Sequence, residues 1–150
     1  SSQFRPVGAS LKAFGSHVMI TLLRVFPPAL LYLNGVIYLW VGWLFISDPV
    51  TWLEALGVTL VSDLGITDLR AVYGGFITGF GLFLLLCGWK SEWVGPGVWL
   101  LALTYAGLVA ARSWGVLVEG QYNDLVMQIY IAEWISLVLS LLAMFCLRRR

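Results

Sequence analysis

The chain has 150 residues, of which 60% are hydrophobic and only 11% are charged. A water-soluble domain of this size carries about 25% charged and about 45 to 50% apolar residues, so most of this chain is expected to contact lipid. The net charge is only +1 and the basic residues form no stripe, which argues against nucleic acid as a partner. One histidine and two cysteines without CxxC spacing predict neither a metal site nor a cofactor.

The first 28 residues are predicted to form a cytoplasmic segment that precedes the membrane domain. Within it, residues 9–26 place polar side chains such as His17 and Arg24 on one helical face, and apolar side chains mostly on the other. This pattern is typical of an amphipathic helix that lies at the membrane surface. Pro27 and Pro28 are predicted to break this helix from the first crossing.

Four mainly apolar windows follow, each near the length of about 20 residues that a membrane helix needs. The predicted crossings cover about residues 29–46, 69–89, 98–118 and 125–147. Between the first two, Asp48 as a helix cap and Pro49 in the first turn predict a short helix on the outer surface. The remaining connections are short, so the predicted fold is an all-α integral membrane four-helix bundle over residues 29–147, with a basic tail at 148–150.

Charged residues divide between the two sides of this predicted bundle. One side has Arg5, Lys12, Arg24, Lys90, Arg148, Arg149 and Arg150, and the other has Asp48, Glu54, Asp63, Asp68, Glu119 and Asp124. Because Lys and Arg accumulate on the cytoplasmic side of membrane proteins, both termini are predicted to lie in the cytoplasm and the bundle in the bacterial inner membrane.

Small residues recur at regular spacing in the second and third crossings. Those predicted to pack inside the bundle are Ala71, Gly75 and Gly79, with Gly74, Gly81 and Gly88 on an adjoining side, and Gly107, Ala111 and Gly115. The second crossing is therefore expected to be central. Another stripe on the third crossing comprises Ala102, Ala106 and Ala110, and it lies about 140° away at about 100° per residue. This stripe is expected to face either lipid or another subunit.

Two charges lie deep inside the predicted crossings. Arg112 lies about 12 Å below the outer end of its helix and Glu133 about 14 Å below the start of the next. Ions inside a membrane normally pair and face the bundle interior, so we predict an ion pair between them. Asp68, Arg70 and Glu119 are expected to join the pair in a polar cluster that opens outward.

This cluster has two interpretations. In the first, Arg112 and Glu133 form a buried latch that specifies helix order, because a balanced pair needs no ligand. In the second, Arg70 and Arg112 hold a small anionic or polar molecule, or Glu133 carries a proton.

At these residues the chain resembles a bacterial family of small four-helix integral membrane proteins of unknown function. The matching features are Leu69, Arg70 and Ala71 with Gly74 and Gly75, then Arg112 and Ser113 with Glu119 and Gly120, and finally Glu133. The resemblance covers about residues 29–147 and implies an inner-membrane four-helix fold, with no established enzymatic activity.

No catalytic constellation is recognisable in the sequence, so we predict a non-enzymatic accessory or structural subunit of a larger membrane complex. Its expected partners are the lipid bilayer and either other subunits or further copies of the chain. The alternative is a binder or carrier of a small anionic or lipid-like molecule, acting through Arg70, Arg112 and Glu133.

Overall fold

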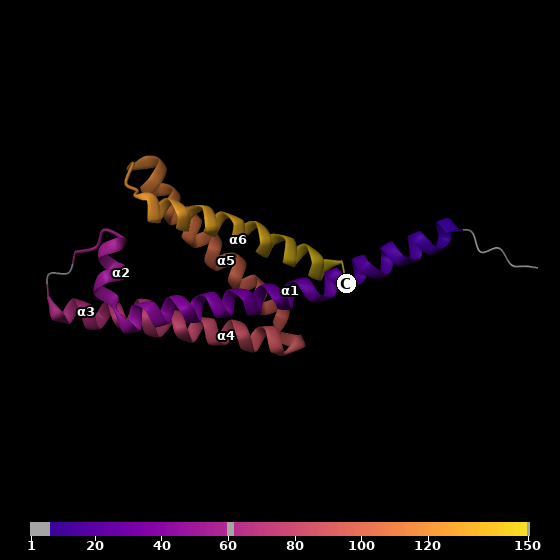
Figure 1. Ribbon diagram of the computed structural model, residues 1–150, viewed down its shortest axis with the longest axis horizontal. Coiled ribbons are helices and arrows are strands. Elements are labelled where there is room, and N and C mark those ends of the chain that lie inside the picture. Colours follow the sequence, from indigo (N-terminus) through magenta and orange to yellow (C-terminus); the bar gives the residue numbers. More distant parts are fainter. Residues whose placement is uncertain (1–6, 60–61, 150) are drawn as a thin grey trace, which may run out of the picture.

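The computed structural model describes residues 7–59 and 62–149, and side chains from residue 18 onward within those ranges. This part of the chain is helical, and its long helices run side by side (Figure 1). The elements are α1 (Val7–Ser47), α2 (Pro49–Ala55), α3 (Asp63–Leu69), the π-helical η1 (Arg70–Phe76), α4 (Ile77–Trp89), the 3₁₀ turn η2 (Ser91–Trp93), α5 (Val94–Ser113), the π-helical η3 (Trp114–Val118) and α6 (Asp124–Arg148).

Four helical stretches are long and apolar enough to cross a membrane, as the sequence predicts. They are Val18–Ser47, Asp63–Trp89, Ser91–Val118 and Asp124–Arg148. The end of the bundle that carries Lys90, Arg148 and Arg149 is called the basic end below. The opposite end, called the acidic end, carries Asp48, Glu54, Asp63, Asp68, Glu119 and Asp124.

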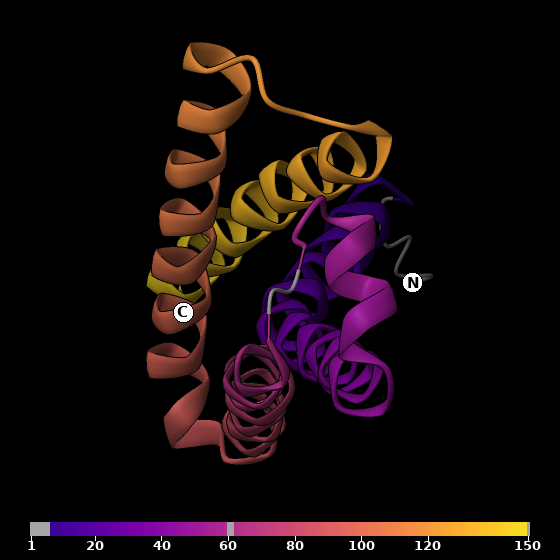
Figure 2. The same ribbon diagram turned by 90° about the vertical axis from the view of Figure 1, so that its left-hand side faces the viewer.

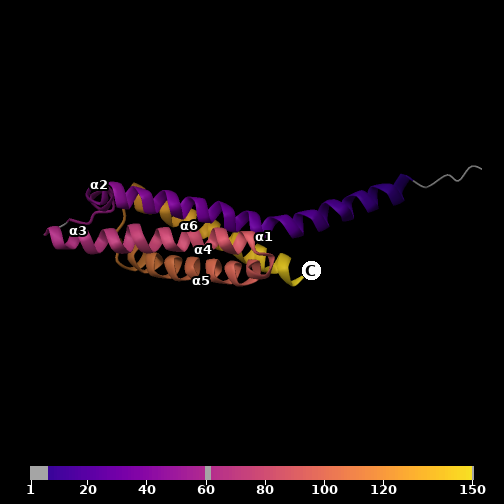
Figure 3. The same cartoon turned by 90° about the horizontal axis from the view of Figure 1, so that it is seen from below.

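The predicted helix break at Pro27 and Pro28 is wrong, because α1 continues through both prolines. Figure 3 shows α1 as a single bent helix that extends well past the basic end of the bundle. Proline is tolerated inside membrane helices, where packing and local adjustment compensate for the lost hydrogen bonds. Pro27 is fully buried here, so neighbouring helices hold the chain at this point.

Side chains of the predicted amphipathic segment are described from residue 18 onward. Between residues 18 and 25, Thr21 and Arg24 lie about 60° apart on one side of α1, at about 100° per residue. Most of the apolar side chains on the remaining faces are exposed, as for Met19 (60%) and Leu22 (63%). The side chain of His17 lies outside the described residues.

Helix capping explains two boundaries at the acidic end. The Asp48 side chain accepts a hydrogen bond from the Thr51 amide at 3.2 Å, and Pro49 begins α2, so the predicted short helix is present. Ser62 caps α3 in the same way through the Gly65 amide at 3.4 Å. As a result, the helix that contains the second crossing starts before the predicted residue 69.

The third crossing also begins earlier than predicted. Gly95, Pro96 and Gly97 read as a connection in the sequence but lie in the first turn of α5, where proline costs no hydrogen bond. Gly97 is required for packing, because a Cβ at this position would lie 2.6 Å from the Cβ of Cys87. The small residues therefore serve the contact between α4 and α5.

The central helix of the bundle is α1, not the second crossing as predicted. It packs most extensively along α4 and η1, and it also contacts α6 and α5. The view along the bundle in Figure 2 shows α1 and α4 paired, with α5 and α6 on the other side.

The close contact between α1 and α4 depends on glycines seven residues apart. Gly35 and Gly42 of α1 face Gly81 of α4 and Gly74 of η1, respectively, and Gly88 of α4 lies against Tyr32 and Pro28 of α1. A Cβ at Gly81 would lie only 2.9 Å from the Gly35 carbonyl oxygen, so the two backbones nearly touch. Small residues permit such an approach where lipid provides no hydrophobic driving force.

Only one of the two stripes predicted on the second crossing does this packing. Ala71, Gly75 and Gly79 are exposed, and a Cβ at either glycine would meet nothing within 4 Å. Gly74, Gly81 and Gly88 face α1 instead, at a seven-residue repeat that runs from the wider turns of η1 into α4.

Candidate functional site

Arg112 of α5 and Glu133 of α6 form a two-pronged ion pair. The Arg112 Nε donates to Oε2 at 2.8 Å, and its Nη2 donates to Oε1 at 2.9 Å. The side chain of Glu133 is 8% exposed and that of Arg112 is 27% exposed, so the carboxylate is the more deeply buried partner. This parallel geometry is the strongest arrangement available to Arg and a carboxylate. The predicted contact between the two residues is therefore present.

A second polar contact joins the same two helices. The hydroxyl groups of Ser113 and Tyr130 lie 2.8 Å apart, one position along α5 and about one turn along α6 from the ion pair. The π-helical turns of η3 begin directly after Ser113. Wide turns of this kind often occur at functional sites, and here they end the straight part of α5 at its polar contacts with α6.

A buried hydrogen bond that the sequence analysis missed ties α5 to α1. The Tyr105 hydroxyl donates to Asn34 Oδ1 at 2.6 Å, while Asn34 Nδ2 donates to the Leu30 carbonyl at 2.9 Å. Asn34 is 3% exposed and Tyr105 is 6% exposed. The available signal was an amide side chain within the apolar run of the first crossing, because a polar group inside a membrane needs a partner.

Tyr38 of α1 lies beside this hydrogen bond. Its ring centroid is 6.4 Å from that of Tyr105. Together these groups form what is called the polar network below: Asn34, Tyr38, Tyr105, Arg112, Ser113, Tyr130 and Glu133. The network connects α1, α5 and α6 inside the bundle.

The other three residues of the predicted cluster do not join the pair. Asp68, Arg70 and Glu119 are exposed at the acidic end, and Arg112–Glu133 is the salt bridge found among the described residues. Arg70 begins η1, which packs against α1, α3 and α4 rather than along α5 or α6. Asp68, Arg70 and Glu119 therefore form no salt bridge with Arg112 or Glu133.

Of the small residues predicted to form the two stripes of the third crossing, all but Ala102 lie away from the rest of the bundle. Ala106, Gly107, Ala110 and Ala111 are exposed, and a Cβ at Gly107 or Gly115 would meet nothing within 4 Å. The predicted packing role of Gly107, Ala111 and Gly115 inside the bundle is therefore wrong. Ala102 is only 5% exposed, so it does not belong to the outward face with Ala106 and Ala110.

Most members of the polar network bond to one another, which limits the groups that they can offer to a ligand. Both prongs of Arg112 engage Glu133, and neither of two shallow surface hollows is lined by a member of the network. Within the described residues, no three His, Cys, Asp or Glu side chains gather closely enough to hold a metal ion. The contact that the geometry shows is the one that joins α5 to α6.

The fold and this site define a class: a helical protein with four helices suited to crossing a membrane and an ion pair between the last two. The chain belongs to the family described as "Domain of unknown function (DUF4345)", whose model matches residues 28–144. Comparison with curated proteins and with solved structures gives no match. The predicted membership in a family of unknown function is confirmed.

Proposed function

We propose that the protein is a non-enzymatic subunit of a larger assembly in the bacterial inner membrane, with both termini in the cytoplasm. In this assembly it presents a fixed four-helix body to another transmembrane helix. The observation that supports this most is the outward face of α5, where Ala106, Gly107, Ala110 and Ala111 are all exposed. Small residues on one helix face allow a second helix to approach closely in lipid.

The shape of this face suits a helix rather than a small molecule. Gly107 has no neighbour from its own chain over its Cα, and the exposed rings of Trp99 (49%) and Trp114 (62%) lie toward the two ends of α5. The four small residues thus form a flat area of about two helical turns between larger side chains. Its partner is a helix of another subunit or of a second copy of this chain.

The Arg112–Glu133 pair supports this proposal through its position. It fixes α5 against α6 close to the outward face of α5, which keeps that face in a constant orientation. The alternative of an anionic ligand required Arg112 to be free for binding. Its Nε and Nη2 both donate to Glu133, so at most Nη1 is left for an anion, which favours the docking role.

The experiment compares Ala110→Leu on α5 with Ala132→Leu on α6, an exposed alanine on a different helix. A leucine in a close helix contact costs about 1 to 3 kcal/mol, so Ala110→Leu should weaken association by at least fivefold. Ala132→Leu should leave it unchanged. The readouts are the particle mass in mild detergent and the proteins that co-purify in stoichiometric amount.

A wild-type protein that purifies as a lone monomer would contradict the proposal. Equal association of the two variants would contradict the assignment of the docking face to α5. A change in mass without co-purifying proteins identifies a second copy as the partner, whereas a stoichiometric second protein identifies a different subunit.

A further inference from the structure

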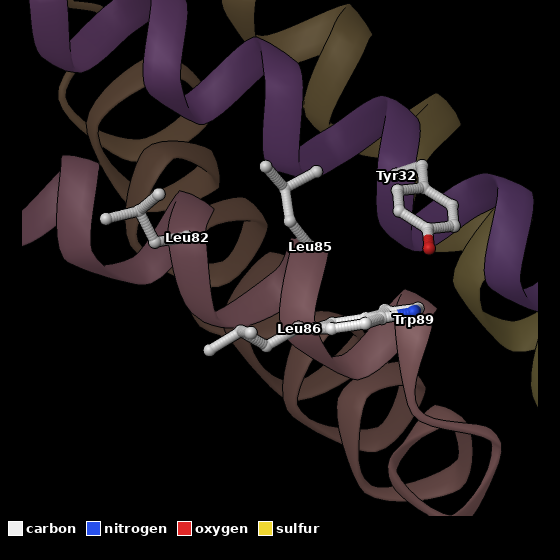
Figure 4. Close-up of a pocket in the computed structure, with 5 residues that line it drawn as sticks. All are labelled: Tyr32, Leu82, Leu85, Leu86 and Trp89. Carbon is white, nitrogen blue, oxygen red and sulfur yellow. The ribbon is translucent and has the colours of Figure 1, made fainter.

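A groove lies between α1 and α4 on the surface of the bundle, away from the polar network. It has a volume of about 410 Å³ and is lined by Tyr32, Leu82, Leu85, Leu86 and Trp89. Figure 4 shows these side chains along the line where the two helices meet. The groove is open along the surface rather than enclosed, a shape that suits an extended chain lying along the helices.

The glycine contacts between α1 and α4 build this groove. Leu85 packs over Gly35, where an added Cβ would lie 2.6 Å from Leu85 Cδ2, and the Tyr32 ring packs over Gly88, where an added Cβ would lie 3.2 Å from two ring carbons. The helices therefore approach closely enough for side chains from both to form one continuous floor. Leu82 (51% exposed) and Leu86 (43% exposed) stand along its side.

The groove is apolar along most of its length and polar at one end. Figure 4 shows the Tyr32 hydroxyl oxygen and the Trp89 indole nitrogen at that end. Trp89 is the last residue of α4 and lies at the basic end, whereas Leu82 lies about 10 Å deeper. Tyr and Trp commonly occupy the boundary between hydrocarbon and headgroups, with an apolar ring body and a polar tip.

The charges near the polar end are predominantly positive. Lys90 follows Trp89 directly, and its Nζ lies 4.6 Å from the centroid of the Trp93 ring. Arg148 and Arg149 lie at the same end, where Glu92 is the acidic residue among those described. A positive surface beside a membrane attracts anionic lipids, by about 1 kcal/mol for each Lys or Arg near the surface.

We propose that the α1–α4 groove binds one anionic phospholipid. An acyl chain lies along Leu82, Leu85 and Leu86, the Tyr32 hydroxyl and the Trp89 indole meet the polar backbone of the lipid, and Lys90 attracts its phosphate. The apolar side chains of the groove contact the acyl chain, and the adjacent positive charge makes an anionic headgroup preferable to a neutral one. This site is independent of the helix that docks on α5.

The test measures lipid retained by the 150-residue protein in native mass spectrometry, after exchange into mild detergent with equal phosphatidylglycerol and phosphatidylcholine. Wild-type protein should retain one phosphatidylglycerol. Leu82→Trp fills the groove and should reduce this occupancy at least fivefold. Leu142→Trp is the matched control, because Leu142 of α6 is 50% exposed against 51% for Leu82.

A second pair of variants tests the headgroup contact without altering the groove. Lys90→Gln should lower the preference for phosphatidylglycerol over phosphatidylcholine about fivefold, which corresponds to about 1 kcal/mol. Arg148→Gln removes the same charge at the same end on α6 and should change the preference less than twofold. Lys90 is exposed, so its replacement leaves the fold intact.

Three results would overturn the proposal. The first is lipid retention that is equal in Leu82→Trp and Leu142→Trp, together with an unchanged preference in Lys90→Gln. The second is a wild-type protein that retains no phospholipid. The third is a loss of dimer mass in Leu82→Trp with lipid retention unaffected, which would assign the groove to a second copy of the chain.

Discussion

The two members of the Arg112–Glu133 pair differ in their access to the surface, and this difference sets the consequence of losing either one. Glu133 is nearly enclosed, whereas about a quarter of the Arg112 side chain is exposed at 27%. A long arginine side chain can extend its charged group toward the membrane boundary when its partner is absent. The shorter Glu133 side chain lies within the bundle, so its carboxylate cannot reach the membrane boundary in the same way.

Arg112→Leu should therefore destabilise the protein more than Glu133→Leu. We expect a loss of about 3 to 5 kcal/mol in the free energy of unfolding for Arg112→Leu, because it leaves a buried charge without a partner, and about 1 to 3 kcal/mol for Glu133→Leu. The double replacement should recover most of the loss, since no orphan charge remains. Unfolding in mixed micelles measures these values, and additive losses in the double variant would show that the pair does not act as a latch.

At the scale of helices, the seven-residue glycine repeat is what brings α1 and α4 together. Gly81 and Gly79 lie two positions apart on α4, yet only Gly81 faces α1. A Cβ at Gly81 would meet the Gly35 carbonyl oxygen at 2.9 Å and the Leu39 nitrogen at 3.0 Å, both of which are backbone atoms. Neither can move without shifting a helix.

Gly81→Ala should consequently cost about 1 to 3 kcal/mol of stability through overpacking. Gly79→Ala is the matched control, because its Cβ would meet nothing within 4 Å. It should be neutral or stabilising by up to about 1 kcal/mol, the difference in helix propensity between the two residues. Thermal unfolding in detergent compares the pair, and similar midpoints for both variants would refute the assigned contact face.

Sequence-based prediction succeeded for the features that depend on the length of an apolar run or on the depth of a residue along its helix. Four apolar windows gave four helices, and equal depth placed Arg112 beside Glu133. Prediction failed where the outcome depends on which side of a helix is covered, since the outward glycines and those facing α1 have the same composition. The continuity of α1 at Pro27 was also unpredictable from local rules, because burial against other helices overrides the tendency of proline to end a helix.

For the whole molecule, the 30-residue span Val18–Ser47 of α1 is longer than a bilayer requires. At about 1.5 Å per residue it measures about 45 Å, against a hydrocarbon thickness of about 30 Å. Tilting accommodates part of such an excess. Because Gly88 packs beside Pro28, the remaining apolar turns lie beyond the basic end of α4. The N-terminal turns of α1 are therefore expected to lie along the membrane surface or against a partner.

The division of charge between the two ends predicts the orientation of the molecule. Lys90, Arg148 and Arg149 mark the basic end, and the positive-inside rule assigns that end to the cytoplasm. In intact spheroplasts, a membrane-impermeant maleimide should label Glu119→Cys to near completion, whereas Ser91→Cys should react only after permeabilisation. The unaltered chain is the control, because Cys87 is buried and the partly exposed Cys146 sets the background labelling at the basic end. Labelling of Ser91→Cys from outside, with Glu119→Cys protected, would establish the opposite orientation and place the proposed phospholipid site in the outer leaflet.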